Sequence, residues 1–370
     1  MVRAQVALLQ QNGHRVVQYG QDNATIAGFG LLRKASLLFT ATWDQRSYRE
    51  LRGLIRKERP ELAHCHNLVP LISPAAYYAC RAENVPVVQT LHNFRMWCPA
   101  GTMFHNGAAC AQCCASPARA VLKACYRNSR TQTAAVAGML ACHRSAHTFE
   151  HMVDAYSVPS RFCLERAAEG GLPREKITVQ PNFLLHDPGG RTGGRDYAIY
   201  VGRICREKGV REMLQAWRRL RGIPLLVVGD GPLRDAAESE APEGVRFTGA
   251  LSPEAAFAHM RAARFLVFPS IGYETFGLTV LEAAACGVAT LGARTGAIPE
   301  LVAETRTGLL FDPRDIDEFV DKVRWAWSHP LAMNEMGAVA RREYLQRYTA
   351  GDAYHSLMTL YAKVLGRHDR

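Results

Sequence analysis

The stretch that decides the fold reads Pro269-Ser-Ile-Gly-Tyr-Glu274-Thr-Phe-Gly277-Leu-Thr-Val-Leu-Glu282-Ala-Ala-Ala-Cys-Gly287. The apolar residues before it predict a strand that ends at Pro269, and those after Gly277 predict a helix. The free N–H groups at the start of that helix, together with its dipole, suit a diphosphate. Gly277 allows a phosphate close to the backbone. Glu282, one or two turns into the helix, can accept hydrogen bonds from a ribose diol, while Glu274 on the loop lies nearer a reacting sugar.

A second loop of this kind follows the predicted strand over 197–201. It reads Gly202-Arg203-Ile-Cys-Arg-Glu-Lys208-Gly209, and both Arg203 and Lys208 can reach a phosphate above the strand end. A third turn, Gly229-Asp-Gly-Pro232, closes the predicted strand over 224–228. Each loop alone could be a capped turn with surface charges, but together with the two glutamates they favour a phosphate-binding function.

Helix and strand patterns alternate around these loops, which predicts an α/β protein whose parallel sheets carry helices on both faces. In the first half we expect helices over 2–11, 47–59 and 73–84, with Ser73 as the cap and Pro74 at the first position of the last, and strands over 14–19, 62–66 and 85–91. In the second half we expect strands over 197–201, 224–228, 245–248, 265–269 and 288–291, and helices over 207–220, 253–262, 278–285, 316–328 and 348–365. The chain of 370 residues suggests two domains, joined by a Gly-rich linker over 187–196.

The start of the chain departs from the doubly wound pattern. Such a domain opens on a strand and a Gly-rich turn before its first helix, whereas this sequence begins with the helix predicted over 2–11. We interpret the first strand as missing, through a truncated gene model or a late start codon. A different topology is the alternative.

These motifs resemble those of glycosyltransferase family 4, which are retaining enzymes of the GT-B fold with two Rossmann-like doubly wound domains facing a cleft. Glu274 and Glu282 match the Glu-x7-Glu motif of that family, and Arg203 and Lys208 match its donor-diphosphate pair. The resemblance implies that Glu274 contacts the transferred sugar and that Glu282 binds the ribose. The donor-binding residues expected on this basis are Arg203, Lys208, Gly229, Phe247, Phe276, Gly277, Leu278, Thr279 and Glu282.

The resemblance also sets the domain boundaries. Pro181-Asn182 matches the turn that joins the two domains, and the final helix of this family crosses back to the first domain. We therefore expect an acceptor-side domain of residues 1–184 plus about 350–370, and a nucleotide-sugar-binding domain of residues 185–349. The segment around Phe247 would lie near the nucleotide base.

Two histidine motifs in the first half resemble a subset of the family. They are His64-Cys-His66-Asn67 and Gln89-Thr-Leu-His92-Asn93, and both end predicted strands. The resemblance implies that His92 is a catalytic-site residue that faces the donor sugar near the leaving phosphate. A hydrogen-bonded turn histidine is the alternative for His92, and for His66 a structural and a functional role stay equally open.

Cysteine is concentrated in one region, since eight of the eleven cysteines fall between Cys65 and Cys142. Cys98, Cys110, Cys113 and Cys125 are spaced C-x11-C-x2-C-x11-C, and four thiolates at such a spacing suit tetrahedral zinc. A structural zinc ion that orders the loop over 99–117 is one interpretation. Reduced thiols without a metal and a redox function are the others. We expect no catalytic cofactor, because no Asp-x-Asp motif is present where a GT-A enzyme would hold a metal.

The net charge of +11 is unevenly placed: residues 1–184 hold 21 Lys and Arg against 11 Asp and Glu, and residues 185–370 hold 24 against 23. The first half either has a solvated basic face or meets an anionic partner, such as a lipid surface or a diphosphate-linked acceptor. No nucleic-acid motif is present. No run of about 18 apolar residues suggests a membrane span, and the start is not a signal peptide. We expect a cytoplasmic protein, with the inner face of the membrane as a place of peripheral contact.

The sequence therefore predicts a retaining glycosyltransferase that moves a hexosyl group from a UDP- or GDP-sugar to a saccharide or lipid-linked acceptor, in cell-surface polysaccharide synthesis. Two alternatives remain open at this point. One is a nucleotide-sugar epimerase of the same fold, and the other is a catalytically impaired nucleotide-sugar-binding protein.

Overall fold

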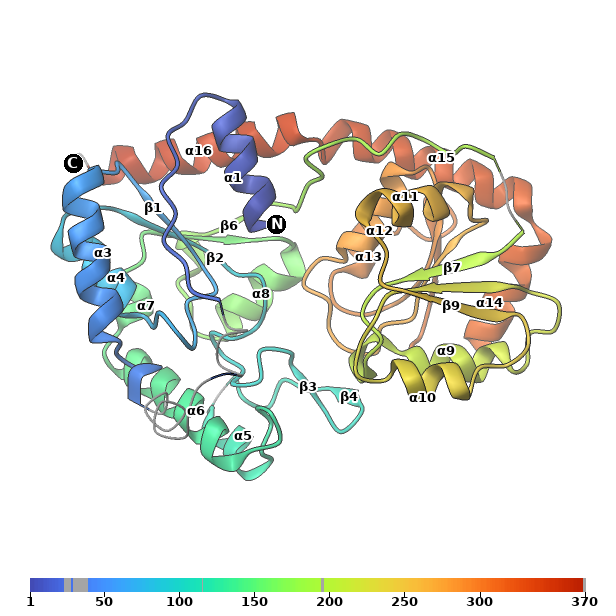
Figure 1. Cartoon of the computed structure of the whole chain (residues 1–370), viewed down its shortest axis with the longest axis horizontal. Coiled ribbons are helices and arrows are strands. Elements are labelled where there is room, and N and C mark those ends of the chain that lie inside the picture. Colours follow the sequence, from blue (N-terminus) through green and yellow to red (C-terminus); the bar gives the residue numbers. More distant parts are fainter. Residues whose placement is uncertain (23–27, 29–38, 115, 194–195, 369–370) are drawn as a thin grey trace. The chain divides into compact units, whose positions relative to one another are not determined.

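The computed structural model describes residues 1–22, 28, 39–114, 116–193 and 196–368. The chain divides into two compact units, shown in Figure 1. Unit 1 comprises Met1–Met103, Cys110–Gln180 and Tyr354–Arg370, and unit 2 comprises Phe104–Ala109 and Pro181–Ala353. Within the part of the chain that is described, no helix is both long and apolar enough to cross a membrane.

Unit 1 is built on a parallel sheet of four strands in the order β1-β2-β5-β6. The strands are β1 (Ala63–His66), β2 (Val87–Thr90), β5 (Ala155–Val158) and β6 (Ile177–Val179). The predicted strands over 62–66 and 85–91 are confirmed. The strand predicted over 14–19 is wrong, because these residues are mostly exposed and have no ladder partner among the described residues. No described residue before Ala63 belongs to a strand.

Helices surround this sheet, and their starts follow from local side-chain caps. Asp44, Ser129 and Ser160 each accept a hydrogen bond from a backbone N–H in the first turn that follows. Ser73 is not the N-cap that the sequence predicted, because Pro74 takes that position. The Ser73 hydroxyl accepts from the N–H of Ala75 at the start of that helix and from the N–H of Asp44. The helical elements are α1 (Val2–Gln11), α3 (Gln45–Glu58), α4 (Ala75–Ala82), α5 (Ala118–Leu122), α6 (Arg130–Ser145), α7 (Thr148–His151), α8 (Arg161–Glu169), η2 (Arg174–Lys176) and α16 (Ala350–His368).

The last helix, α16, begins in unit 2 and ends in unit 1. Its residues Leu360 and Val364 are buried against Val88 of β2 and Ala155 of β5. The final helix predicted over 348–365 is confirmed as α16, within a few residues at each end. The helix before it, α15 (Pro330–Arg347), was not predicted, and Tyr348 is its C-cap.

Unit 2 contains a parallel sheet of six strands in the order β12-β11-β10-β7-β8-β9. From the centre of the sheet, β7, β8 and β9 follow one another toward one edge, and β10, β11 and β12 follow one another toward the opposite edge. The strand order therefore reverses between β7 and β10, and ligands of such sheets bind beyond the carboxyl ends of the strands at that reversal. The strands are β7 (Ala198–Val201), β8 (Leu225–Val228), β9 (Val245–Gly249), β10 (Leu266–Phe268), β11 (Thr290–Ala293) and β12 (Gly308–Phe311).

Apolar side chains fill both faces of this sheet. Ala198 and Tyr200 of β7 belong to one buried cluster and Ile199 to another, as the alternation of a strand requires. The rings of Phe311 and Phe319 stack in the first cluster, with their centroids 4.1 Å apart. The predicted helices over 278–285 and 316–328 are confirmed to the residue. The helical elements are η3 (Arg206–Lys208), α9 (Val210–Trp217), α10 (Arg234–Ser239), α11 (Pro253–Ala262), α12 (Leu278–Ala285), α13 (Ile298–Leu301), α14 (Ile316–Ser328) and α15.

Candidate functional site

The two loops that the sequence singled out both start at the reversal of the unit 2 sheet. The loop Gly202–Gly209 follows β7, and the loop Pro269–Gly277 follows β10. Because β7 and β10 are parallel neighbours, both loops leave the same edge of the sheet. The N–H groups of Ile271 and Gly272 each donate to the carbonyl of Glu207 at 3.0 Å, which joins one loop to the other.

Glycine is needed where the loops touch. Gly209 has φ +70°, and a Cβ at this position would lie 1.8 Å from the carbonyl oxygen of Pro269. Gly229, at the end of β8, has φ +140°, and its Cβ would lie 1.9 Å from the carbonyl oxygen of Gly202. No side chain fits at such distances, so both glycines hold the backbones of the loops together.

Gly209→Ala is therefore expected to lower the free energy of unfolding by about 3 kcal/mol or more, through strain and overlap combined. Gly222→Ala is the matched control, because Gly222 has φ +74° but no atom within 4 Å of the place where a Cβ would lie. We expect that control to cost only about 1–2 kcal/mol, the strain of a left-handed residue alone. Urea unfolding curves of the two variants measure the difference, and equal losses would refute the importance of this contact.

Lys208 and Glu274 meet at the junction of the two loops. The Lys208 ammonium lies 2.6 Å from Glu274 Oε1, and the two side chains are 22% and 13% exposed. The Ser270 hydroxyl donates to the same carboxylate oxygen at 2.6 Å. The backbone of Glu274 is fixed as well, because its carbonyl accepts from Ala297 N–H at 3.0 Å. The sequence did not single out Ser270 for this role, although its place directly after the strand-ending Pro269 could have suggested it.

Arg203 lies on the exposed side of its loop. Its guanidinium pairs with Glu207 at 3.0 Å while the side chain stays 69% exposed. Such an exposed pair contributes little to stability. Arg203 and Lys208 both follow the end of β7, but in this structure each is paired with a glutamate.

Helix α12 begins directly at Gly277. This residue is the N-cap with φ +97°, and a Cβ added here would lie 2.6 Å from Ile298 Cδ1. Leu278 and Thr279 form the first turn, whose N–H groups have no partner within a helix. Phe276 is buried beside Tyr348, with ring centroids 6.2 Å apart, so it fixes the entry of the chain into α12.

Glu282 lies on the second turn of α12, and burial raises the pKa of its carboxyl to about 7. No described residue gives this carboxyl a hydrogen bond or an ion pair. A buried acid without a protein partner is suited to receive donors from a ligand. Phe247, the remaining donor-site candidate, lies in β9 and packs against the buried cluster of unit 2.

Three histidines stack at the ends of β1 and β2 in unit 1. His66 Nδ1 and His92 Nε2 are hydrogen-bonded at 2.8 Å, and the ring of His64 stacks on that of His66 at 4.5 Å. His64 is held by Thr90 Oγ1 and by the hydroxyl of Tyr361 from α16, both at 2.6 Å. Burial, with neighbouring charges, lowers the pKa of His64 to about 3, that of His66 to about 2 and that of His92 to about 4. All three are neutral at pH 7, so His92 can act as a hydrogen-bonding group and not as a cation.

The four cysteines predicted as zinc ligands form no disulfide, and in the sequence they flank the β3–β4 hairpin (Phe104–His105 and Ala108–Ala109). Burial raises the pKa of Cys113 to about 11, and Cys98, Cys125 and Cys110 are close enough to add to the rise. The described residues contain only one group of three metal-binding side chains with ligand atoms within 4.8 Å of one another, which is His147, Glu150 and His151. The four cysteines are therefore close enough to affect one another's pKa, but their sulfur atoms do not all lie within 4.8 Å of one another.

Several solved structures have the same arrangement of elements. HepE of Anabaena, solved with UDP and glucose, superposes with a TM-score of 0.65 at 14% identity over 97% of this chain and 89% of that one. The sucrose-phosphate synthase of Thermosynechococcus elongatus superposes with a TM-score of 0.67 at 17% identity, over 90% and 80% of the two chains. The fold is therefore GT-B, with two Rossmann-like domains.

Sequence relatives and family models identify the class of enzyme. Glycogen synthase of Mycobacterium tuberculosis is 28% identical over 332 residues, which are 84% of this chain and 70% of the relative. A model described as Glycosyltransferase Family 4 matches residues 2–184, and one described as Glycosyl transferases group 1 matches residues 195–329. The protein is a glycosyltransferase. It belongs to glycosyltransferase family 4.

Proposed function

We propose that the protein transfers a hexosyl group from a UDP- or GDP-sugar to a saccharide or lipid-linked acceptor with retention of configuration. The observation that carries this proposal is the contact between Lys208 and Glu274 at the strand-order reversal of unit 2. It combines a cation for a diphosphate with a carboxylate for a sugar, next to the N-terminus of α12. Glu282 supplies a ribose acceptor further along the same helix.

In the proposed reaction, the acceptor hydroxyl attacks the anomeric carbon on the face from which the diphosphate departs. The bond between that carbon and the phosphate oxygen breaks, and the departing phosphate takes the hydroxyl proton. Lys208, Arg203 and the first N–H groups of α12 stabilise the negative charge that develops on the diphosphate. Glu274 and the neutral His92 hydrogen-bond the transferred sugar. No step requires a protein nucleophile.

The choice of donor nucleotides rests on relatives. HepE of Anabaena was solved with UDP and glucose, and a relative in Mycolicibacterium smegmatis is a GDP-mannose-dependent alpha-mannosyltransferase, 37% identical over 47% of this chain and 45% of that protein. From these relatives we infer that this chain also uses a nucleotide-sugar donor.

A panel of UDP-, GDP-, ADP- and dTDP-sugars tests the proposal by thermal shift and by release of nucleoside diphosphate. We expect one nucleotide class to raise the melting temperature of the wild type and not that of Glu282→Ala. Slow hydrolysis should accompany binding, and ¹H NMR should show the donor's own anomer released first. Binding without hydrolysis would favour the impaired binding protein, and epimerised donor without transfer would favour the epimerase.

The charge of the first half of the chain supports the proposed acceptor and place of action. Residues 1–184 carry an excess of basic over acidic side chains, which supports a role in cell-surface polysaccharide synthesis at the inner face of the membrane. Flotation with anionic liposomes tests this role: we expect binding at low salt that is lost at high salt, and no binding at low salt would refute it.

We also propose a structural zinc ion held by Cys98, Cys110, Cys113 and Cys125. The set fits zinc chemically, because it offers four thiols. Two of them, Cys110 and Cys113, form a C-x2-C motif directly after the β3–β4 hairpin. Metal analysis of the purified protein should find one zinc per chain, and Cys110→Ser should lose it while Cys142→Ser, at an exposed cysteine outside the set, should not. A metal-free wild type would rule the ion out.

A further inference from the structure

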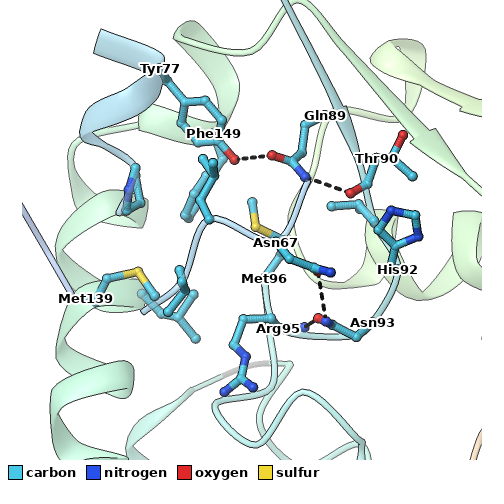
Figure 2. Close-up of a pocket in the computed structure, with 15 residues that line it drawn as sticks. Asn67, Tyr77, Gln89, Thr90, His92, Asn93, Arg95, Met96, Met139 and Phe149 are labelled. Carbon is cyan, nitrogen blue, oxygen red and sulfur yellow. Dashed lines mark hydrogen bonds between the residues drawn. The ribbon is translucent and has the colours of Figure 1, made fainter. Parts of the chain in front are cut away.

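Unit 1 contains a cavity of about 190 Å³ at the carboxyl ends of β1 and β2 (Figure 2). This volume is far above the roughly 10–15 Å³ that one water needs. One wall is polar and comes from the residues after the two strands, including Asn67, His92 and Asn93. Another wall is apolar and includes Met139 and Phe149. A mixed lining of this kind suits a sugar, which presents both hydroxyl groups and C–H faces.

Arg95 supplies the only guanidinium among the described residues that line this cavity. It lies on the loop that follows His92, and it carries a charge with no acidic partner. Its guanidinium donates to the carbonyl of Pro99 and lies 4.8 Å from the centre of the Tyr126 ring. None of the ion pairs formed within the described residues includes it, and burial lowers its pKa. A partly buried cation without a carboxylate is costly, and an anionic ligand would offset that cost.

The surroundings of Arg95 are positive as well. Arg127 lies over the same Tyr126 ring at 5.4 Å, and Arg144 donates to the carbonyls of Cys114 and Met96, each at 3.4 Å. Burial lowers the pKa of Arg144, and only cysteines oppose that shift. Arg127 thus lies close to Arg95, and Arg144 contacts the backbone of Met96, which lines the cavity, while none of the three arginines is paired with a carboxylate within the described residues.

The position of Arg95 is fixed before any ligand binds. Asn93 Oδ1 accepts from the backbone N–H of Arg95 at 2.9 Å, and Asn93 Nδ2 donates to Asn67 Oδ1 at 3.1 Å. Figure 2 shows Asn67 and Asn93 side by side, with Arg95 next along the same loop. These bonds order the backbone of the loop, while the Pro99 carbonyl and the Tyr126 ring hold the guanidinium. A side chain held in this way loses little freedom on binding, and its planar donors match an oxyanion.

We propose that this cavity is the acceptor subsite and that it takes a saccharide bearing an oxyanion, a carboxylate or a phosphate, which pairs with Arg95. That the bound saccharide acts as the acceptor rests on the proposed glycosyl transfer, whereas anion binding in unit 1 can be measured independently of that transfer. His92 at the same cavity would then lie beside the saccharide that receives the sugar.

Isothermal titration with three probes tests the proposal at low salt, with unit 2 saturated by the nucleotide that the donor panel identifies. The probes are glucuronate, inorganic phosphate and neutral glucose. We expect one or both anions to bind the wild type at least tenfold more tightly than glucose, and Arg95→Gln to remove that preference. Preference for glucuronate would identify a carboxylate-bearing saccharide, and preference for phosphate a phosphate-linked one.

Two further variants keep the result interpretable. Arg49→Gln removes the same charge from an exposed site on α3 and should leave anion binding unchanged, whereas Arg95→Lys should retain part of it. Nucleotide binding by Arg95→Gln shows that the variant is folded. Equal binding of glucose and the anions, equal losses in Arg95→Gln and Arg49→Gln, or no binding of any probe would overturn the proposal. If the donor panel identifies no nucleotide, the same titrations are made on the free protein, and a preference for anions that Arg95→Gln loses would refute the proposed transfer while leaving the Arg95 site standing.

Discussion

Lys208→Met is expected to lower kcat/KM for donor hydrolysis by roughly 10²–10³-fold, the effect of removing one group that stabilises charge in a transition state. The variant keeps most of the side-chain volume and removes the ammonium that lies 2.6 Å from Glu274 Oε1. Two effects then act together. The departing diphosphate loses a cation, and the Glu274 carboxylate is left uncompensated beside a diphosphate of the same sign. Release of nucleoside diphosphate under steady-state conditions measures the loss.

A matched control is available in the same unit. Lys322 pairs with Glu304 at 2.8 Å, with side-chain exposures of 30% and 33%, and it lies on α14 rather than on a loop at the sheet reversal. Lys322→Met should leave kcat/KM within about threefold of the wild type. Glu274→Gln should be strongly impaired, and the double variant Lys208→Met/Glu274→Gln should lose less than the two single losses combined, because the residues are in contact. Similar activities of Lys208→Met and Lys322→Met would refute the assigned role.

The loops at this reversal could be predicted because each rests on local signals. An apolar run, a glycine and a second apolar run are enough to predict β10, the loop and α12, and the predicted helix matches to the residue. The contact between Lys208 and Glu274 could not be predicted from such signals. The two residues lie 66 positions apart, and they meet only because β7 and β10 are neighbours in the sheet. The family resemblance named both residues but not their contact.

Errors arose where a local pattern needed a distant partner. Residues 14–19 read as a strand, but an extended segment becomes a strand only when another strand pairs with it, and the described residues supply none. The zinc ion inferred from the spacing of the four cysteines is not such an error and stays a prediction, because spacing alone says nothing of how closely the sulfurs approach. Arg95 was not singled out because its importance depends on the absence of a carboxylate around a cavity, which is a property of the folded chain.

The carboxyl of Glu282 is expected to make stability depend on pH. Its pKa is raised by burial from 4.5 to about 7, so the folded state binds more protons than the unfolded state between these values. The contribution of this carboxyl to stability is therefore fully present below about pH 4.5 and is lost as the pH rises through about 7. Glu282→Gln removes this loss. The free energy of unfolding of the variant should equal that of the wild type near pH 4.5 and exceed it by up to about 3 kcal/mol above pH 7. Glu335→Gln, an exposed control on α15, should show no such gap in urea unfolding at the two pH values.

The same carboxyl links nucleotide binding to proton release. Hydroxyl groups of a ribose that donate to Glu282 favour its ionised form and so lower its pKa in the complex. Near pH 6.5, where most of the free protein carries a protonated Glu282, binding should release a large fraction of one proton, and affinity should rise with pH until about 7. Titrations in buffers of different ionisation enthalpy measure this release directly. Glu282→Gln should bind the nucleotide more weakly, with no proton release, although it is the more stable protein at pH 8. A variant that still releases the proton, or that binds as tightly as the wild type at pH 8, would show that the ribose does not contact Glu282.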